Sequence, residues 1–446
     1  MKRSTPSPRS PRRAWRGRTL VATLAPTLLA LGAPPLRADP NGVGDERPAT
    51  APAVAASKPA APSIDLALCL DTSGSMDGLL DAARQKLWAI VNDLALAEPT
   101  PRLRVALLTF GNDGHPAEGG WVKIDAPLTE DLDLVSQQLF ALTTNGGTEL
   151  VGRVLATANA SLDWAPAPEA LKLVVVAGNE SADQDQQVRF GEACRLLIER
   201  GITVNAIYCG NPADELAPGW QEVAKRADGH FAAIDQQNGT VVIATPFDGE
   251  LAALSTAIND TYLPYGAAGI VAWGNQRAQD ANAEACNSAT AAARANTKAC
   301  KLYTCDWDLV EQVKTGQLKL EEAKKEELPE KLRELTQEQR QQCIDAAWAK
   351  RTKLKEQIQG VSAKRDAHVT AELAKLGMEE SSAFDRAVRD ALRAQAQAKG
   401  LRFPPAPKVP EAKPTETPAK PIDTKPADSK PTDSKPADAQ QEQHGT

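Results

Sequence analysis

The 446-residue sequence has few aromatic residues, only four histidines and none of the common nucleotide-binding loops. Aromatic side chains make up 4% of the residues, against 32 prolines, which indicates that some of the chain does not pack into a core. A serine hydrolase is not indicated, because the sequence has no G-x-S-x-G elbow. It also has no G-x-x-x-x-G-K-[ST] loop and no G-x-G-x-x-G after a strand, which excludes the usual phosphate-binding fingerprints.

The net charge is small, and long apolar runs are few. The formal net charge of -7 is small for this length and argues against non-specific nucleic-acid binding. Beyond the N-terminal region, no segment is long and apolar enough to span a membrane. An apolar content of 42% nevertheless suffices for a sizeable core. The length predicts two or three domains, or one domain with long appendages.

Residues 1–38 have the pattern of an export signal. Residues 1–18 contain one lysine and six arginines but no acid, and an apolar run at 20–33 is followed by small residues. This order predicts a signal peptide and a mature protein that is periplasmic or secreted. A disordered basic leader is the alternative, and the export route stays open. Residues 39–62, rich in alanine and proline, are predicted to form a linker.

Residues 63–263 alternate between apolar strands and amphipathic helices, which predicts a doubly wound, mostly parallel α/β sheet. In such sheets ligands bind beyond the carboxyl ends of the strands, where the strand order switches. The predicted strands lie at 64–70, 103–110, 121–124, 171–177, 203–208 and 230–234. The predicted helices lie at 76–94, 131–142, 150–162, 188–200, 219–227 and 247–262.

After residue 263 the sequence no longer has the pattern of strands. Residues 264–402 are rich in Ala, Glu, Lys, Gln and Arg at helical spacing, which predicts an α-helical region. An α-hairpin packed on the sheet domain and an elongated, coiled-coil-like arm are both compatible with that pattern. The charged helical faces of 311–365 are predicted to be solvated surface. Residues 403–446 repeat Pro, Lys and Asp and are predicted to be a disordered tail.

The feature that indicates chemistry is a set of oxygen donors at two turns. Asp71, Ser73 and Ser75 follow the first predicted strand at every second position, and Thr148 follows two glycines before a predicted helix. A carboxylate and hydroxyls are hard ligands of the kind that Mg²⁺, Ca²⁺ or Mn²⁺ prefers. The two turns therefore predict a divalent-cation site.

These motifs resemble the metal-ion-dependent adhesion site of the von Willebrand factor type A domain family. The resemblance covers roughly residues 63–263, under half of the chain. It implies that Asp71, Ser73, Ser75 and Thr148 hold a divalent cation, Mg²⁺ first, with Mn²⁺ or Ca²⁺ as alternatives. It also implies a protein partner whose acidic side chain completes the coordination of the ion.

The sequence departs from the family pattern after the fourth predicted strand. The family usually has an aspartate there, and this chain has Gly178. Asn179 or Glu180 is expected to reach the second shell or to replace the missing ligand, and a vestigial site without metal is the alternative. Asp113 and Asp214 lie in Gly/Asn turns on the same rim, where either partner contact or turn chemistry explains them.

The seven cysteines fit an exported protein in which disulfides can persist. Cys69 is predicted to be a core residue, and Cys194 and Cys209 to be either core thiols or a disulfide. One or two disulfides are expected in the helical region, because its cysteines lack the C-x₂-C spacing of a zinc site. Those cysteines are Cys286, Cys300, Cys305 and Cys343.

Together these features predict an exported adhesion- or scaffold-type protein that captures a partner's acidic residue at a metal ion. The first alternative is a metal-independent envelope scaffold that uses the helical region. The second is a phosphotransferase with Asp71 as nucleophile, which the serine at position 73 and the absence of a clear lysine with paired acids after a later strand argue against. An enzyme is not expected.

Overall fold

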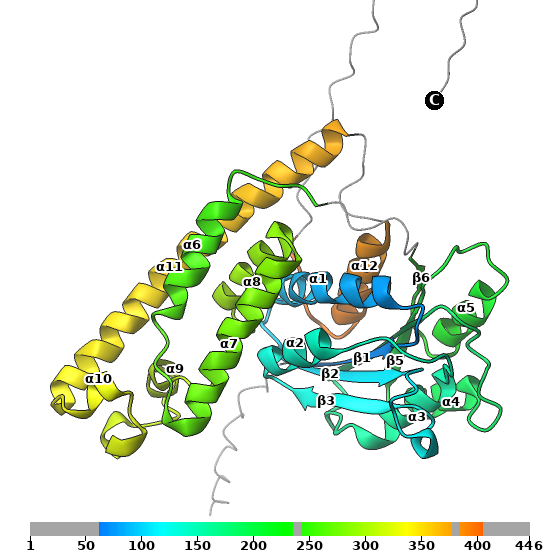
Figure 1. Cartoon of the computed structure of the whole chain (residues 1–446), viewed down its shortest axis with the longest axis horizontal. Coiled ribbons are helices and arrows are strands. Elements are labelled where there is room, and N and C mark those ends of the chain that lie inside the picture. Colours follow the sequence, from blue (N-terminus) through cyan, green and yellow to red (C-terminus); the bar gives the residue numbers. More distant parts are fainter. Residues whose placement is uncertain (1–61, 235–241, 377–382, 405–446) are drawn as a thin grey trace, which may run out of the picture. The chain divides into compact units, whose positions relative to one another are not determined.

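The computed structural model describes residues 62–234, 242–376 and 383–404 (Figure 1). The predicted signal peptide at 1–38 lies outside the described residues. So do nearly all of the predicted linker and of the predicted C-terminal tail.

A six-stranded sheet forms the centre of the described chain. Its strand order is β3-β2-β1-β4-β5-β6, and all neighbours are parallel except β2 and β3, which are antiparallel. The predicted mostly parallel sheet is therefore confirmed. The strands are β1 (Ser63–Asp71), β2 (Arg102–Phe110), β3 (Lys123–Thr129), β4 (Leu171–Gly178), β5 (Ile202–Tyr208) and β6 (Phe231–Ala233).

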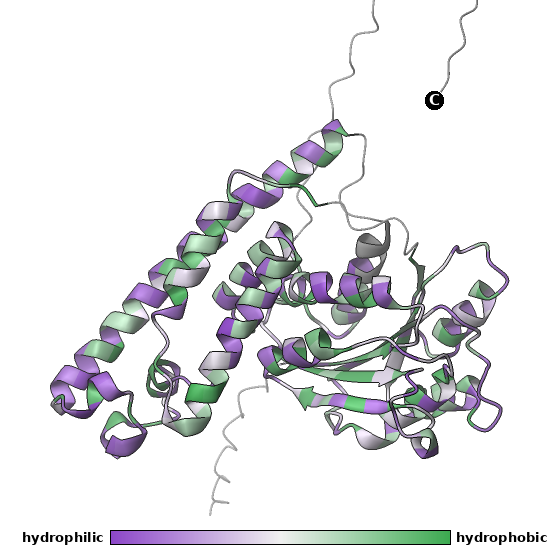
Figure 2. Cartoon of the chain, viewed as in Figure 1, coloured by the Kyte–Doolittle hydropathy of each residue, from purple (hydrophilic) through white to green (hydrophobic). Residues whose placement is uncertain are grey.

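The central strands are apolar on both faces, because helices cover both. In β1, Leu66, Leu68 and Leu70 join the core on one face, while Ala67 and Cys69 join the core on the other. This explains why the strand reads as a continuous apolar run rather than an alternating one. Figure 2 shows strands that are mostly hydrophobic between helices that mix hydrophobic and hydrophilic residues.

Two sets of helices complete a doubly wound domain. On one face lie α1 (Asp77–Leu94) and α2 (Leu132–Ala141), whose buried side chains pack with Leu66 and its neighbours. On the other face lie α3 (Val151–Ser161), α4 (Phe190–Glu199) and α5 (Ala217–Arg226). The bounds of these five helices agree with the predicted ones to within two residues, as is usual for helix ends.

The strand order reverses between β1 and β4. The chain runs from β1 to β2 on one side and later enters β4 on the other side of β1. Leu70 pairs with Ala177, so the carboxyl ends of β1 and β4, at Asp71 and Gly178, are neighbours. This edge is the switch point at which doubly wound sheets bind ligands.

Helices that follow the sheet pack on α1 and α2, which cover one of its faces. α7 (Gly266–Cys286) contacts α2, and α8 (Ser288–Ala299) contacts α1, α6 (Asp248–Asn259) and α11 (Gln337–Lys375). Of the two predicted arrangements, the structure has helices packed on the sheet domain. The other elements are the helices α9 (Leu309–Lys314), α10 (Glu330–Arg333) and α12 (Ala383–Ala398), and the short turns η1 (Ala117–Gly119), η2 (Leu320–Glu322) and η3 (Lys325–Glu327).

Buried ion pairs join this helical region to the sheet domain. The Arg294 guanidinium of α8 lies 2.7 Å from the carboxylate of Asp133 in α2 and 2.8 Å from that of Asp280 in α7. Lys298 also pairs with Asp280, at 2.6 Å. Arg294 further stacks over the ring of Trp88 in α1, 4.4 Å from its centroid. A buried arginine with carboxylates on both sides fixes how α8 sits against α1 and α2.

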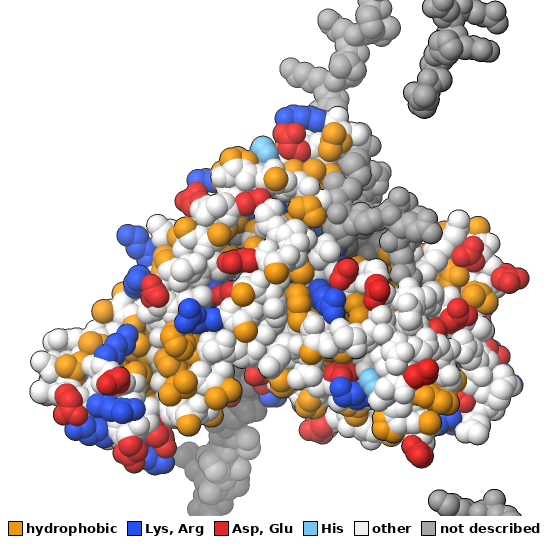
Figure 3. Space-filling model, in the orientation of Figure 1, with side chains coloured by type: hydrophobic (Ala, Val, Ile, Leu, Met, Phe, Trp, Pro, Cys, Tyr) orange, Lys and Arg blue, Asp and Glu red, His pale blue; other side chains and the backbone are white. Residues whose placement is uncertain are grey.

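The disulfides that the sequence predicts are not formed. No disulfide joins any of the described residues, which include all seven cysteines. Cys69 and Cys194 are core residues, and the Cys194 thiol points to the backbone oxygen of Val223. Charged side chains of both signs mix over the helical region on the face seen in Figure 3. The prediction that the charged faces of 311–365 are solvated is wrong for Arg351 and Arg365, which are buried and pair with Asp308 and Asp248. No described helix is long and apolar enough to cross a membrane.

Candidate metal centre

Asp71 forms the floor of the candidate site, at the end of β1. Its side chain is 0% exposed. Oδ1 accepts a hydrogen bond from the backbone N–H of Ser73 at 2.8 Å, which bends the chain out of the strand. Oδ2 receives no hydrogen bond within the described part of the chain. A buried carboxylate oxygen without a donor is energetically unfavourable unless a cation or a proton compensates it.

A line of polar side chains leads from this floor to the surface. The Oγ atoms of Ser73 and Ser75 lie 3.3 Å apart, and the amide of Asn179 donates to Ser75 Oγ at 3.0 Å. Ser73 is 1% exposed, whereas Ser75 is exposed. The predicted ligands Asp71, Ser73 and Ser75 are thus together, with the innermost one buried and the outermost one accessible to solvent.

The second predicted loop lies directly beside the first. Gly74 N–H donates to the oxygen of Gly146 at 3.0 Å, and Asn145 N–H donates to the oxygen of Thr72 at 3.0 Å. Thr148 pairs through its backbone with Gly111, the residue after β2. These contacts bring Thr148 to the same edge of the sheet as Asp71, as the sequence predicts.

Glu149 is a site residue that the sequence reasoning missed. Its side chain is 3% exposed, and Oε2 receives no hydrogen bond from the described residues. Its carboxyl lies within hydrogen-bonding reach of the Asp71 carboxyl. Burial and the neighbouring Asp71 raise the pKa of Glu149 to about 9, and burial raises the pKa of Asp71 as well. Two acids held this close share a proton unless a cation lies between them.

One signal in the sequence could have found this residue. Glu149 directly follows Thr148, the ligand that opens a predicted helix, so its side chain starts at the same rim. An acid in that position reads as an ordinary favourable charge at a helix start. The structure shows instead that the side chain is buried.

The aspartate that the family usually carries would be crowded at Gly178. A Cβ added at Gly178 would lie 3.1 Å from Asp71 Oδ2 and 3.0 Å from Cη2 of Trp220. The Trp220 ring is held in place by a 2.8 Å hydrogen bond from Nε1 to the backbone oxygen of Glu180. A tryptophan ring therefore occupies the space beside the missing carboxylate.

The other predicted residues have different surroundings. Asn179 contacts Ser75 as described, while the Glu180 carboxylate is exposed and acts on Asp71 and Glu149 only through its charge. Asp214 Oδ2 accepts from Tyr208 Oη at 3.2 Å and from the Asn211 N–H at 3.1 Å, so it closes its own turn. Asp113 is exposed and packs against Gly146, where an added Cβ would overlap the Asp113 carboxyl and where the φ of +86° favours glycine.

The donor set fits a hard divalent cation. Among the described residues no group of three or more His, Cys, Asp or Glu side chains could hold a metal. The site instead combines hydroxyls with the paired carboxyls of Asp71 and Glu149, all of them oxygen donors of the type that Mg²⁺ binds. The two carboxylate oxygens without donors are the observation that favours a cation here.

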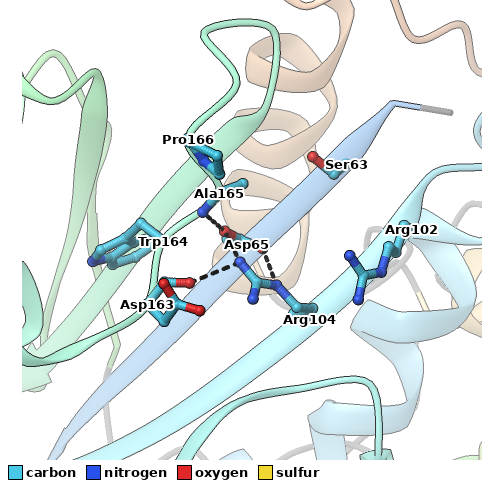
Figure 4. Close-up of a pocket in the computed structure, with 8 residues that line it drawn as sticks. All are labelled: Ser63, Asp65, Arg102, Arg104, Asp163, Trp164, Ala165 and Pro166. Carbon is cyan, nitrogen blue, oxygen red and sulfur yellow. Dashed lines mark hydrogen bonds and ion pairs between the residues drawn. The ribbon is translucent and has the colours of Figure 1, made fainter. Parts of the chain in front are cut away.

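A second polar pocket, at the opposite end of β1, provides a contrast (Figure 4). It has a volume of about 130 Å³ and is lined by residues that include Asp65 and Arg104. Asp65 is also fully buried, but its oxygens accept from Arg104 Nε at 2.8 Å, Arg104 Nη2 at 2.7 Å and the N–H of Ala165 at 2.7 Å. Because Asp65 is fully paired, this pocket reads as structural, unlike the Asp71 site.

Comparison with known proteins gives a family for part of the chain. Residues 65–240 match the family model of the von Willebrand factor type A domain. No curated protein matches the chain.

Several solved structures are similar in fold. Proximal thread matrix protein 1 from the mussel byssus, with a zinc-occupied MIDAS motif, is 18% identical over 40% of this chain and 43% of that chain, with a TM-score of 0.31. A von Willebrand factor type A protein from Catenulispora acidiphila is 20% identical over 40% of each chain (TM-score 0.30). The pilus adhesin SpaC from Lactobacillus rhamnosus GG is 14% identical over 40% of this chain and 28% of that chain (TM-score 0.32). The chain spans less than half the length of each of these proteins.

Proposed function

Residues 65–240 match the von Willebrand factor type A domain, and from this premise we propose that the chain binds a protein partner through a divalent metal ion. The fold is one of protein interaction and adhesion. In our proposal, Asp71, Ser73, Ser75 and Thr148 hold Mg²⁺, and an acidic side chain of the partner enters the coordination sphere.

The observation that carries the proposal is the unpaired, buried Oδ2 of Asp71 beneath hydroxyls that reach the surface. A cation bound there would compensate the carboxylate, whose burial is otherwise offset only by a proton shared with Glu149. Neutral hydroxyls leave part of the charge of the ion uncancelled, so the ion remains attractive to an incoming carboxylate. Exposure of Ser75 supports access for such a partner group.

The choice of ion follows from the ligands. Mg²⁺ is bound in proteins by few carboxylates and keeps several of its waters, whereas Ca²⁺ usually takes more protein oxygens. A site with hydroxyls and few acids therefore favours Mg²⁺, with Mn²⁺ next.

Export to the periplasm or the medium is part of the proposal. It is supported by the basic residues of 1–18, the apolar run at 20–33 and the small residues after it. All of these lie outside the described residues.

We propose binding rather than catalysis. A phosphotransferase would use Asp71 as a nucleophile, but this side chain is 0% exposed and its Oδ1 is engaged by the Ser73 N–H. A scaffold that works through the helical region without metal is the other candidate. For such a scaffold, capture of the partner would survive chelation of the metal ion, whereas for the proposed site it would not.

Titration calorimetry with Mg²⁺ and Mn²⁺ tests the metal half of the proposal. We expect saturable binding that Ser73→Ala abolishes and that Ser161→Ala, an exposed serine of α3, leaves unchanged. Partner capture from envelope extract should require Mg²⁺ and fail in EDTA and in Ser73→Ala. Absence of metal-dependent heat, or capture that persists in EDTA, contradicts the proposal.

A further inference from the structure

We propose that Glu149 is a metal ligand of this site and supplies the second carboxylate, which the family usually draws from the position of Gly178. This inference rests on the proposed function, because it concerns the same ion.

The geometry places both carboxyls around one glycine. A Cβ added at Gly111 would lie 2.6 Å from Asp71 Oδ1 and 2.9 Å from Glu149 Cγ. Gly111 has a φ of +80°, which favours glycine, and its backbone pairs with Thr148. The absence of a side chain at Gly111 thus lets Glu149 fold back over the end of β2 and approach Asp71.

Each carboxyl keeps one oxygen that no described donor reaches. These oxygens are Asp71 Oδ2 and Glu149 Oε2, and both side chains are more than nine-tenths buried. Neither acid forms an ion pair with a described residue, so when both are ionised their charge is left uncancelled. A divalent cation between them would neutralise both at once.

The alternatives to Glu149 are less suited to the role. Glu180 is exposed, Asn179 is neutral and contacts Ser75, and the space at Gly178 is filled by Trp220. Glu149 approaches from the β2 side of Asp71, opposite the β4 side on which Gly178 lies. In this proposal Glu149, on the β2 side of Asp71, takes the role of the shorter aspartate that the family usually has on the β4 side.

A second protein carboxylate leaves fewer positions on the ion for a partner. Asp71, Glu149 and the three hydroxyls would hold the ion directly or through its waters, and one position would have to stay open for a single carboxylate oxygen of the partner.

Mn²⁺ binding followed by the electron paramagnetic resonance of the free ion tests the inference. The proteins compared are the unmodified chain, Glu149→Gln and Glu180→Gln. Glu180→Gln is the matched control, because it removes an exposed acid that acts on the same site only through its charge. We expect Glu149→Gln to weaken Mn²⁺ affinity by about 100-fold or more, and Glu180→Gln to change it by less than about 3-fold. Equal affinities of the two variants overturn the inference and leave the proposed function intact.

A spectroscopic measurement tests whether Glu149 binds the ion, even if the Glu149→Gln variant does not fold. Glutamate labelled with ¹³C at the carboxyl carbon is incorporated into the Glu180→Gln chain, which is then loaded with Mn²⁺. We expect a ¹³C hyperfine coupling to Mn²⁺ from the remaining nearby glutamate, Glu149. A Mn²⁺-bound protein without that coupling overturns the inference. A chain that binds no Mn²⁺ at all overturns the proposed function together with it, which is a different result.

Discussion

The indole ring of Trp220 lies beside Gly178, so that a Cβ added at Gly178 would be 3.0 Å from the ring. Two residues from different elements, the end of β4 and the helix α5, thereby exclude the carboxylate that is usual in the family at this point. On the other side of Asp71, Glu149 is buried and provides a second carboxyl at this edge of the sheet.

Restoring an aspartate at Gly178 is expected to destabilise the metal-free protein. Gly178→Ala should cost about 1–3 kcal/mol, because the methyl group crowds Trp220. Gly178→Asp should cost more, because it adds a third acid beside Asp71 and Glu149. Urea unfolding in EDTA and in Mn²⁺ measures the free energy of unfolding of both variants. Mn²⁺ should recover the part of the loss by which Gly178→Asp exceeds Gly178→Ala, and not the part that the two variants share. Equal stability of the two variants in EDTA would contradict this explanation.

The two buried aspartates of β1 are expected to respond in opposite ways to neutralisation. Asp71→Asn keeps the acceptor for the Ser73 N–H and removes an unpaired charge, so the metal-free protein should be as stable as before or more stable, while metal binding is lost. Asp65→Asn breaks the pair with Arg104 and should cost about 3 kcal/mol without affecting metal binding.

Thermal unfolding with and without Mg²⁺ checks both variants. For a protein that binds the ion, free Mg²⁺ at 100 times Kd adds about 2.7 kcal/mol to the free energy of unfolding. We expect this gain in the unmodified chain and in Asp65→Asn, and none in Asp71→Asn. A gain in Asp71→Asn would show that the ion binds elsewhere.

Stability of the metal-free protein should fall as the pH rises. Burial and Asp71 raise the pKa of Glu149 from its usual 4.5 to about 9, so between these values the folded state holds a proton that the unfolded state has released. The free energy of unfolding therefore decreases with pH across this window, by up to about 1.4 kcal/mol per pH unit for one proton. Glu149→Gln should remove this slope. Unfolding in EDTA at several pH values measures it, and identical slopes for both proteins would contradict the assignment.

The ion pairs around Arg294 are expected to carry the docking of the helical region. Arg294→Met leaves Asp133 buried without its cation and removes the stacking on Trp88, so it should cost about 3–5 kcal/mol. Arg195→Met is the control, because Arg195 pairs with Glu192 and Glu199 on exposed surface and should change little. Chemical denaturation compares them. A small effect of Arg294→Met would mean that apolar contacts alone hold α8.

The sequence by itself determined the sheet and the first half of the site. The spacing of apolar residues is local, and it sets strand and helix periods that the fold follows closely. Asp71, Ser73 and Ser75 are consecutive alternating positions on one turn, so a short stretch of chain already contains the polar line that the structure shows.

Only the tertiary structure decided the rest, because it depends on contacts between residues far apart in the chain. Glu149 is buried because Gly111, which follows β2, has no side chain to keep Glu149 away from Asp71. Gly178 has little space because α5 places Trp220 beside it. The helical pattern of 264–402 is the same for a free arm and for a docked region, and the pairing of Arg294 with Asp133 selects docking. The spacing of cysteines in the sequence likewise does not give the distances between their sulfur atoms in the fold. Among the described residues, which include all seven cysteines, no disulfide is formed.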